Sequence, residues 1–463
     1  MTSDIRGGFR GGAAADVRLA WALTRGSNRQ EWWRAGLTAA GAALATGFAL
    51  AAVALGSLRG HHRVPFAHGL LDQPGERSGV IVSLLLLLVP VLGFLGQCAR
   101  IGAVHRDRRL AALRLAGATP AQVRRIAALE TGPACLSGSV LATAVAVPVL
   151  LGMWDSPSLW TWAGFALVLL GVPALGVAAG VLALRRVVAS PLGWVRRVRP
   201  TSGKGPAVLF TGGVLVVLLL ALWAVGNASG TGREGVPEAV LGLVLTVGAG
   251  TVWLSGATAG AVGRLLAGRA RSAATLIAAE RLRDDPWAAA RTHAAVLLVT
   301  VVGTGFVGFR QAFLADLHAT SRRNQLGMDM AFYTTGVDLT AAAILVGLAI
   351  TLSGLAVGTA ESLANRRRAL AAQVAAGVPR SVLGRALLLE TALPLAPAVA
   401  LAGAGGMAIG VWYGSLAQEY VGRPVPYAAL LVPVAVYACC LLAAATSLPL
   451  LRRCAHPAEL RYA

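Results

Sequence analysis

The chain has 463 residues, of which 56% are hydrophobic and only 13% are charged. This composition is too apolar for an ordinary soluble globular domain, so most of the chain must lie in lipid. The formal net charge of +21 would also suit a nucleic-acid binder. The placement of the basic residues decides between a membrane protein and a nucleic-acid partner.

Long apolar stretches recur along the whole chain. A bilayer core about 30 Å thick needs roughly 20 apolar residues per helix. Ten such stretches occur, centred near Leu44, Leu86, Thr143, Leu170, Val216, Leu245, Val301, Leu345, Ala400 and Val436. We therefore expect an all-α integral membrane protein with about ten transmembrane helices. The first stretch lacks a small-residue cleavage site, which favours a retained helix over a signal peptide.

The basic residues lie mainly on one side of these predicted helices. If the N-terminus is cytoplasmic, 33 of the 41 Lys and Arg fall in the segments 1–34, 100–131, 185–205, 264–291, 361–391 and 451–463. The 20 acidic residues divide 11 to 9 between the two sides, so the bias belongs to the basic residues alone. This is the positive-inside rule. The net charge therefore indicates membrane topology, and we expect no nucleic-acid partner.

An internal repeat is the most informative feature of the chain. Segments 105–131 and 365–391 align without a gap at a spacing of 260 residues, and 11 of their 27 positions are identical. The matches include Gly117 with Gly377 and Glu130 with Glu390. We call 105–131 the first foot and 365–391 the second foot.

The repeat predicts the organisation of the whole chain. Each foot lies between the second and third helices of a four-helix set, and the first helix of each set carries Thr-Gly-Phe, at 46–48 and 304–306. Both sets start on the same side, so they run parallel, related by a pseudo-two-fold axis along the membrane normal. The predicted parts are a cytoplasmic amphipathic N-terminus at 1–34, a four-helix unit at 35–185, a two-helix linker at 186–263, a second four-helix unit at 264–450 and a cytoplasmic tail at 451–463.

The first foot has a definite local shape. Residues 106–116 have helix-forming composition, and Gly117 is a natural left-handed stop at a helix C-terminus. Thr119, Pro120 and Gln122 then supply a cap, a proline at the first helical position and a residue that closes a capping box. The second foot keeps the glycine at 377 and has Pro379, but it loses the capping box.

Glycine pairs at a spacing of four residues have the pattern of close helix packing. These pairs are Gly176/Gly180, Gly256/Gly260, Gly354/Gly358 and Gly406/Gly410.

The feet resemble the signature of FtsX-like (MacB-type) permease subunits of ABC transporters, in which a basic cluster and Leu-Ala precede a Gly and a second helix that ends in Glu. The doubled arrangement is similar to the ten-helix permeases of the bacitracin-efflux type. The resemblance covers both four-helix units, about three quarters of the chain. It implies a multi-pass protein of the bacterial inner (cytoplasmic) membrane with both termini cytoplasmic.

In that family the foot docks into an ATPase subunit, so two feet imply two copies of a cytoplasmic ABC ATPase. The resemblance assigns coupling in the first foot to Arg106, Arg108, Leu110, Leu113, Arg114, Gly117, Ala118, Thr119 and Glu130. In the second foot it assigns Arg366, Arg368, Leu370, Gly377, Val378, Pro379 and Glu390. Taken singly, either Glu is an interfacial carboxylate paired with nearby arginines. Their recurrence favours a shared structural or coupling role.

The chain departs from the family pattern in two places. The family usually has Glu just before the Leu-Ala, where this chain has Arg109 and Ala369. The predicted external loops, about 59–77 and 311–337, are too short to form independent domains. Contact with a substrate would therefore come from the helices or from these short loops.

The chain has no phosphate-binding G-x-x-x-x-G-K-[ST] loop, so we expect no cofactor here and ATP bound by the partner. We also expect no catalytic or metal site. The predicted function is an ABC permease subunit that exports or extracts an amphiphile such as an antibiotic, a peptide or a lipid. One alternative is an ATPase-driven signalling module that controls a sensor kinase without transport. The other is a secondary transporter, which the absence of charges in the middle of the spans disfavours.

Overall fold

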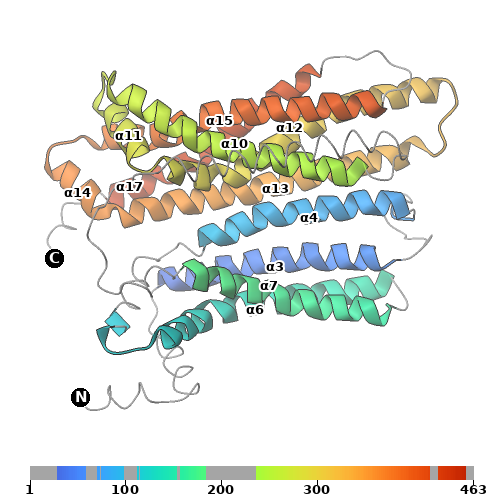
Figure 1. The fold of residues 1–463 in the computed structure, drawn as a ribbon, viewed down its shortest axis with the longest axis horizontal. Helices are drawn as coiled ribbons and strands as arrows, with labels where there is room; N and C mark the ends of the chain where they lie inside the picture. Colours follow the sequence, from blue (N-terminus) through green and yellow to red (C-terminus); the bar gives the residue numbers. More distant parts are fainter. Residues whose placement is uncertain are drawn as a thin grey trace. The chain divides into compact units, whose positions relative to one another are not determined.

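The computed structural model describes residues 29–58, 70–72, 74–98, 112–113, 115–153, 157–183, 236–417 and 426–454. Within these ranges the regular structure is helical throughout, without a β-strand (Figure 1). The all-α fold expected from the composition is confirmed.

Eight helices in the described ranges are long and apolar enough to cross a membrane. They are Trp32–Ser57, Ala121–Gly152, Leu159–Ala178, Gly242–Ala267, Thr292–Arg322, Met330–Asn365, Arg380–Trp412 and Tyr427–Leu451. A shorter apolar helix covers Arg77–Leu92. The predicted centre at Val216 lies outside the described residues, and the other nine predicted centres lie in these helices. The multi-pass character is therefore confirmed, whereas a total of ten helices stays a prediction.

The chain divides into two compact units. The first comprises Met1–Leu58 and Phe94–Thr201, and the second comprises Arg59–Gly93 and Ser202–Ala463. Helix α4 (Pro74–Cys98) contributes to both. The predicted first four-helix unit at 35–185 places this helix wholly in the first half, whereas its contacts group most of it with the second compact unit.

Three long helices make up most of the described part of the first compact unit. They are α3 (Arg29–Ser57), α6 (Pro120–Met153) and α7 (Leu159–Ala183), and each packs on the other two. Thr46 Oγ1 donates to Ser139 Oγ over 2.9 Å, and Ser139 Oγ donates to the Leu169 carbonyl over 3.0 Å. This short hydrogen-bonded chain links all three helices inside their apolar surroundings, a common way to join helices in a bilayer.

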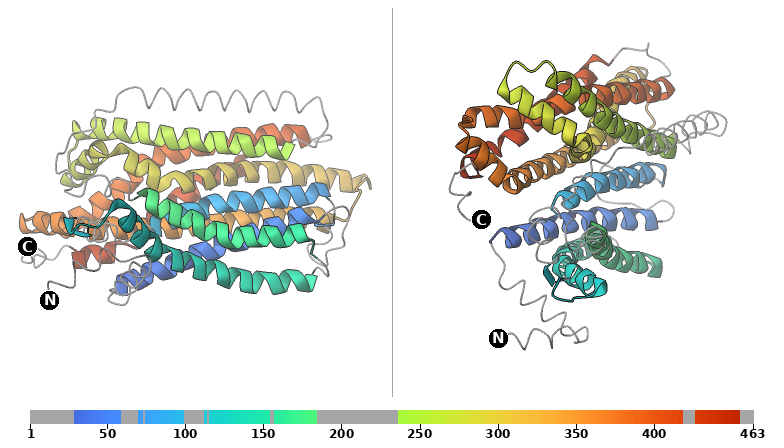
Figure 2. Two further views of the ribbon diagram at one scale, coloured as in Figure 1. Left: turned by 60° about the horizontal axis from the view of Figure 1, so that its bottom comes forward. Right: turned by 60° about the vertical axis from the view of Figure 1, so that its left-hand side comes forward.

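The second compact unit is organised around α12 (Pro286–Arg322). This helix packs against α10 (Val236–Ala267), α13 (Met330–Asn365), α15 (Arg380–Ala417) and α16 (Leu431–Ala445), the last of which follows a 3₁₀ turn, η3 (Tyr427–Leu430) (Figure 2). The apolar core of the second compact unit includes Leu297, Val301 and Leu395, all fully buried.

Helices α12 and α15 approach each other at glycines. A Cβ atom on Gly410 would lie 2.7 Å from the Gly305 carbonyl oxygen, and one on Gly406 would lie 2.8 Å from the Thr304 Cβ. The two backbones therefore meet where neither glycine tolerates a side chain. The close packing predicted for the pair at 406 and 410 is confirmed, and their partner belongs to the Thr-Gly-Phe sequence at 304–306.

Three short helices lie at one end of the second compact unit (Figure 1). They are α11 (Ala273–Asp284), α14 (Arg367–Ala375) and α17 (Leu448–Cys454). Helix α11 packs on α10 and α15, and α14 contacts α13 and α17. The second foot, which includes α14 and the start of α15, is therefore part of a compact group of helices and does not project alone.

Candidate functional site

The described part of the first foot is a tight turn followed by a capped helix. Gly117 has φ of +100°, and the Ala118 N–H donates to the Leu113 carbonyl over 3.0 Å. This is the six-residue closure of a Schellman motif. The Thr119 N–H donates to Gln122 Oε1 (2.8 Å) while the Gln122 N–H donates to Thr119 Oγ1 (3.2 Å). The left-handed stop and the capping box predicted from the sequence are both confirmed.

Some predicted coupling residues of the first foot have described positions. Ala118 is buried, Leu113 is half-buried, and Gly117 and Thr119 are exposed. The buried alanine packs the turn against the chain and leaves the glycine and threonine on its surface. The predicted residues Arg106, Arg108, Leu110 and Arg114 lie outside the described residues.

The second foot repeats the same turn. Gly377 has φ of +88°, and the Val378 N–H donates to the Gln373 carbonyl over 3.0 Å. Helix α15 begins at Arg380, directly after Pro379. Val382 stands where the first foot has the glutamine of its capping box, so the side-chain half of the cap is lost, as predicted.

One face of the second foot is buried inside the chain. Leu370, only 2% exposed, packs with Val378 against Leu383, Leu387 and Leu451. These contacts attach α14 to α15 and α17. The predicted coupling residues Arg368 and Pro379 are exposed on the outside of the foot. Leu370 thus stabilises the foot from within, and the surface open to a partner comes from its neighbours.

Glu130, at the end of the first foot, forms a buried ion pair. Arg34 Nη2 lies 3.0 Å from Glu130 Oε1, and the two side chains are only 11% and 8% exposed. Arg34 belongs to α3 and Glu130 to α6. The pair therefore ties the helix that leaves the first foot to the first helix of its unit.

Glu390, the equivalent residue of the second foot, binds two arginines. Arg281 Nη1 lies 2.7 Å from its Oε2 atom, and Arg366 Nη1 lies 2.8 Å from its Oε1 atom. Arg281 belongs to α11, and Arg366 is the residue between α13 and α14. One carboxylate on α15 thus joins α11 and the junction where the foot begins.

The partner arginines of the two carboxylates come from comparable places. Arg34 ends the basic stretch 25–34 and Arg281 begins the stretch 281–291, each of which precedes a four-helix set. Both basic stretches are visible in the sequence. The sequence did not predict that Arg34 pairs with Glu130 or that Arg281 pairs with Glu390, because these partners are 96 and 109 residues apart in the chain. The counterpart of Arg366 in the first foot, Arg106, lies outside the described residues.

No cluster of three or more His, Cys, Asp or Glu that could hold a metal ion is found in the part of the chain that the structure describes.

Residues 80–192 match the family model of the FtsX-like permease C-terminal domain. The matched segment includes most of α4, the whole first foot, α6 and α7. No curated protein matches the chain. The match covers less than half of the chain and makes this segment similar to FtsX-like permeases. The chain is thus a multi-pass membrane protein that contains a region similar to the FtsX-like permease C-terminal domain.

Proposed function

We propose that this chain is the permease subunit of a bacterial ABC transporter, and that a separate ATPase drives it to export or extract an amphiphile such as an antibiotic, a peptide or a lipid. The observation that carries the proposal is the recurrence of one local structure in both feet. Each has a positive-φ glycine in a Schellman turn, and each continues into a helix whose glutamate binds arginine. A family match over the first foot supports the same assignment.

The second foot is constructed to transmit force. A force applied to α14 is transmitted to α15 through a rigid turn. The turn is rigid because the backbone N–H groups of Gly377 and Val378 are hydrogen-bonded within it. The ion pair between Glu390 and Arg366 also connects α15 directly to the start of α14. Helix α15 in turn meets α12 backbone to backbone at Gly410 and Gly305. Displacement of the foot would therefore move the two helices at the centre of the unit together.

The exposed side of the second foot is basic. Arg367 and Arg368 on α14 and Arg380 at the start of α15 are exposed. Ala369 occupies the position where the family usually has Glu. A partner groove lined with carboxylates fits this surface better than one that offers arginines. We assign such a groove to the ATPase, with one ATPase copy at each foot and two copies in all.

The first experiment is co-purification of the chain in nanodiscs with ABC ATPases of the same organism that are co-expressed with it. We expect one permease with two ATPases in the wild type. The double change Arg367→Glu and Arg368→Glu should reduce ATPase retention at least tenfold. The matched control is the double change Arg322→Glu and Arg323→Glu. These two arginines are exposed at the C-terminal end of α12, away from the second foot. A wild type that retains no ATPase, or equal losses in both double variants, would count against the proposal.

The second experiment separates transport from its alternatives. The reconstituted complex is given ATP and labelled amphiphiles, and their movement between leaflets and into the medium is followed. ATP-dependent movement supports the permease. A complex that hydrolyses ATP but moves no amphiphile favours the signalling module with its sensor kinase. Movement that follows an ion gradient without ATP favours the secondary transporter.

A further inference from the structure

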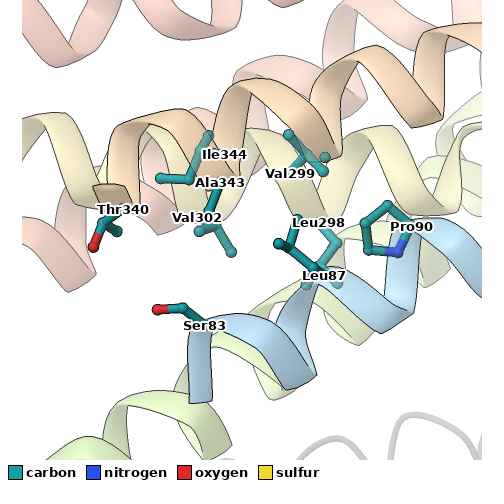
Figure 3. Close-up of a pocket in the computed structure, with 10 residues that line it drawn as sticks. Ser83, Leu87, Pro90, Leu298, Val299, Val302, Thr340, Ala343 and Ile344 are labelled. Atoms are coloured by element: carbon teal, nitrogen blue, oxygen red, sulfur yellow. The ribbon is translucent and has the colours of Figure 1, made fainter. Parts of the chain in front are cut away.

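A crevice of about 90 Å³ opens within the second compact unit, between α4, α12 and α13 (Figure 3). Its lining residues come from the middle part of each helix. They are Ser83, Leu87, Pro90, Leu298, Val299, Val302, Thr340, Ala343, Ile344 and Gly347. Figure 3 shows Ser83 and Thr340 at one end of the crevice and Pro90 at the other.

The lining is almost wholly apolar. None of its residues carries a charge, and its two hydroxyl groups already donate within their own helices. Ser83 Oγ donates to the Gly79 carbonyl and Thr340 Oγ1 donates to the Gly336 carbonyl, both over 2.9 Å. Burial of an ion or a polar headgroup here would leave it without compensating partners, at a high cost in free energy. The crevice therefore selects an uncharged, apolar ligand.

The crevice lies where α4 has few contacts with α12 and α13. Helix α12 packs on α13, whereas the described residues of α4 make only sparse contacts with either helix. Helix α13 approaches α4 closely near Pro90, where a Cβ on Gly347 would lie 3.3 Å from Leu87 Cδ2 and 3.7 Å from Pro90 Cγ. The crevice beside this approach is too apolar to hold ordered water.

We propose that the crevice binds a single acyl chain of a membrane phospholipid, which fills the gap and packs α4 onto α12 and α13. Helices α12 and α13 are long and apolar enough to span a membrane, and α4 contains a shorter apolar segment at Arg77–Leu92. The crevice lies near the middle of each helix, at the depth expected for lipid tails. Its volume of about 90 Å³ is smaller than the roughly 150 Å³ of an apolar cavity that accepts benzene. This favours part of one slim chain over a ring system. The inference goes beyond the proposed function and does not depend on an ATPase.

The test uses photolabelling of the whole chain without ATPase. The protein is reconstituted in phosphatidylcholine vesicles that contain a small fraction of phosphatidylcholine with a diazirine in the middle of one acyl chain. After irradiation, adducts are mapped by peptide mass spectrometry. We expect labelling at Ala343 and Leu87 at least fivefold above labelling at Leu345, which is 65% exposed on the same helix α13. Leu345 reports contact with bulk lipid.

Two substitutions that fill the crevice keep the test falsifiable. Ala343→Trp and Val302→Phe should each reduce labelling at Leu87 at least fivefold, whereas Leu345→Trp should leave it unchanged. Two variants on different helices are used so that misfolding of one does not decide the outcome. The proposal is overturned if Leu87 is labelled no more than Leu345, or if neither filling variant changes the labelling of Leu87.

Discussion

At the scale of single residues, the two equivalent glutamates sit in different environments. Glu130 is 8% exposed and pairs with Arg34, whereas Glu390 is 22% exposed and is shared by Arg281 and Arg366. When less water surrounds an ion pair, the attraction between its charges is screened less. Loss of one partner then costs more in the free energy of unfolding. We therefore expect the first pair to contribute more to stability, whereas the second joins α11 to the junction between α13 and α14.

Glu130→Gln keeps the shape of the side chain but removes its charge from a buried pair. We expect a loss of about 2–3 kcal/mol in the free energy of unfolding, because Arg34 stays buried without its counter-charge. Thermal unfolding in detergent, followed by tryptophan fluorescence, measures the change.

The matched control is Glu280→Gln. Its pair with Arg283 is spaced three residues apart on α11, and the side chains are 42% and 52% exposed. A pair of this kind contributes less than about 0.5 kcal/mol. Equal decreases in unfolding temperature for Glu130→Gln and Glu280→Gln would show that burial does not strengthen the Arg34 pair.

Local sequence was enough to predict the turn of the first foot. Gly117, Thr119 and Gln122 interact within a few residues of one another, so their pattern specifies the geometry. Local sequence did not identify Arg34 and Arg281 as partners of the two glutamates. A basic stretch does not specify which carboxylate, about a hundred residues away in the chain, each of its arginines will contact. The turn was thus predictable from local sequence, whereas the ion pairs could be assigned only from the packed helices.

At the scale of elements, glycines serve two different purposes. At Gly117 and Gly377 a Cβ would meet nothing within 4 Å, so these residues are needed only for their positive φ. At Gly138 the backbone angle is helical, and the need is for space, because a Cβ would collide with the Ala39 carbonyl group of α3. The two kinds respond differently to substitution.

Gly377→Ala tests the conformational role. We expect it to cost about 1–2 kcal/mol, because alanine is strained in the left-handed region, and to lower ATPase retention by loosening the foot. Gly377→Asn should cost less, since asparagine adopts this conformation more readily. Unfolding temperatures of the two variants give the order. If alanine is tolerated as well as asparagine, the positive φ is not what position 377 requires.

Gly138→Ala tests the packing role in the first compact unit. The added methyl group must push α6 away from α3, and we expect destabilisation of about 1–3 kcal/mol. The control is Gly47→Ala on α3, where a Cβ meets nothing within 4 Å. There alanine should stabilise by about 0.5–1 kcal/mol through its higher helix propensity. The opposite signs of the two shifts in unfolding temperature are the expected result, and a stabilising Gly138→Ala would contradict the close contact.

At the scale of the whole molecule, the apolar pattern predicted the spanning helices well because lipid leaves a hydrophobic segment few alternatives to a helix. Pattern alone did not show that most of α4 groups with the second compact unit. It also gave no sign of the crevice beside Leu87 and Ala343. Both features depend on which helices become neighbours, and helices that are apolar all round carry little information about that choice.

The distribution of basic residues makes a prediction about the orientation of the whole chain. The second foot belongs to the side that carries 33 of the 41 Lys and Arg, and the turn after α12 belongs to the other side. Because basic loops are retained in the cytoplasm, Ser381 should face the cytoplasm and Gln325 the outside. Both residues are exposed, so cysteines placed there accept a label.

The measurement uses cells that express variants in which the five native cysteines are replaced and one cysteine is introduced. A membrane-impermeant maleimide should label Gln325→Cys in intact cells. It should label Ser381→Cys only after the membrane is permeabilised. The reverse pattern would place the feet outside, where no ATP is available, and coupling to an ATPase at Gly377 would then be impossible. Orientation is thus the condition on which the function of both feet depends.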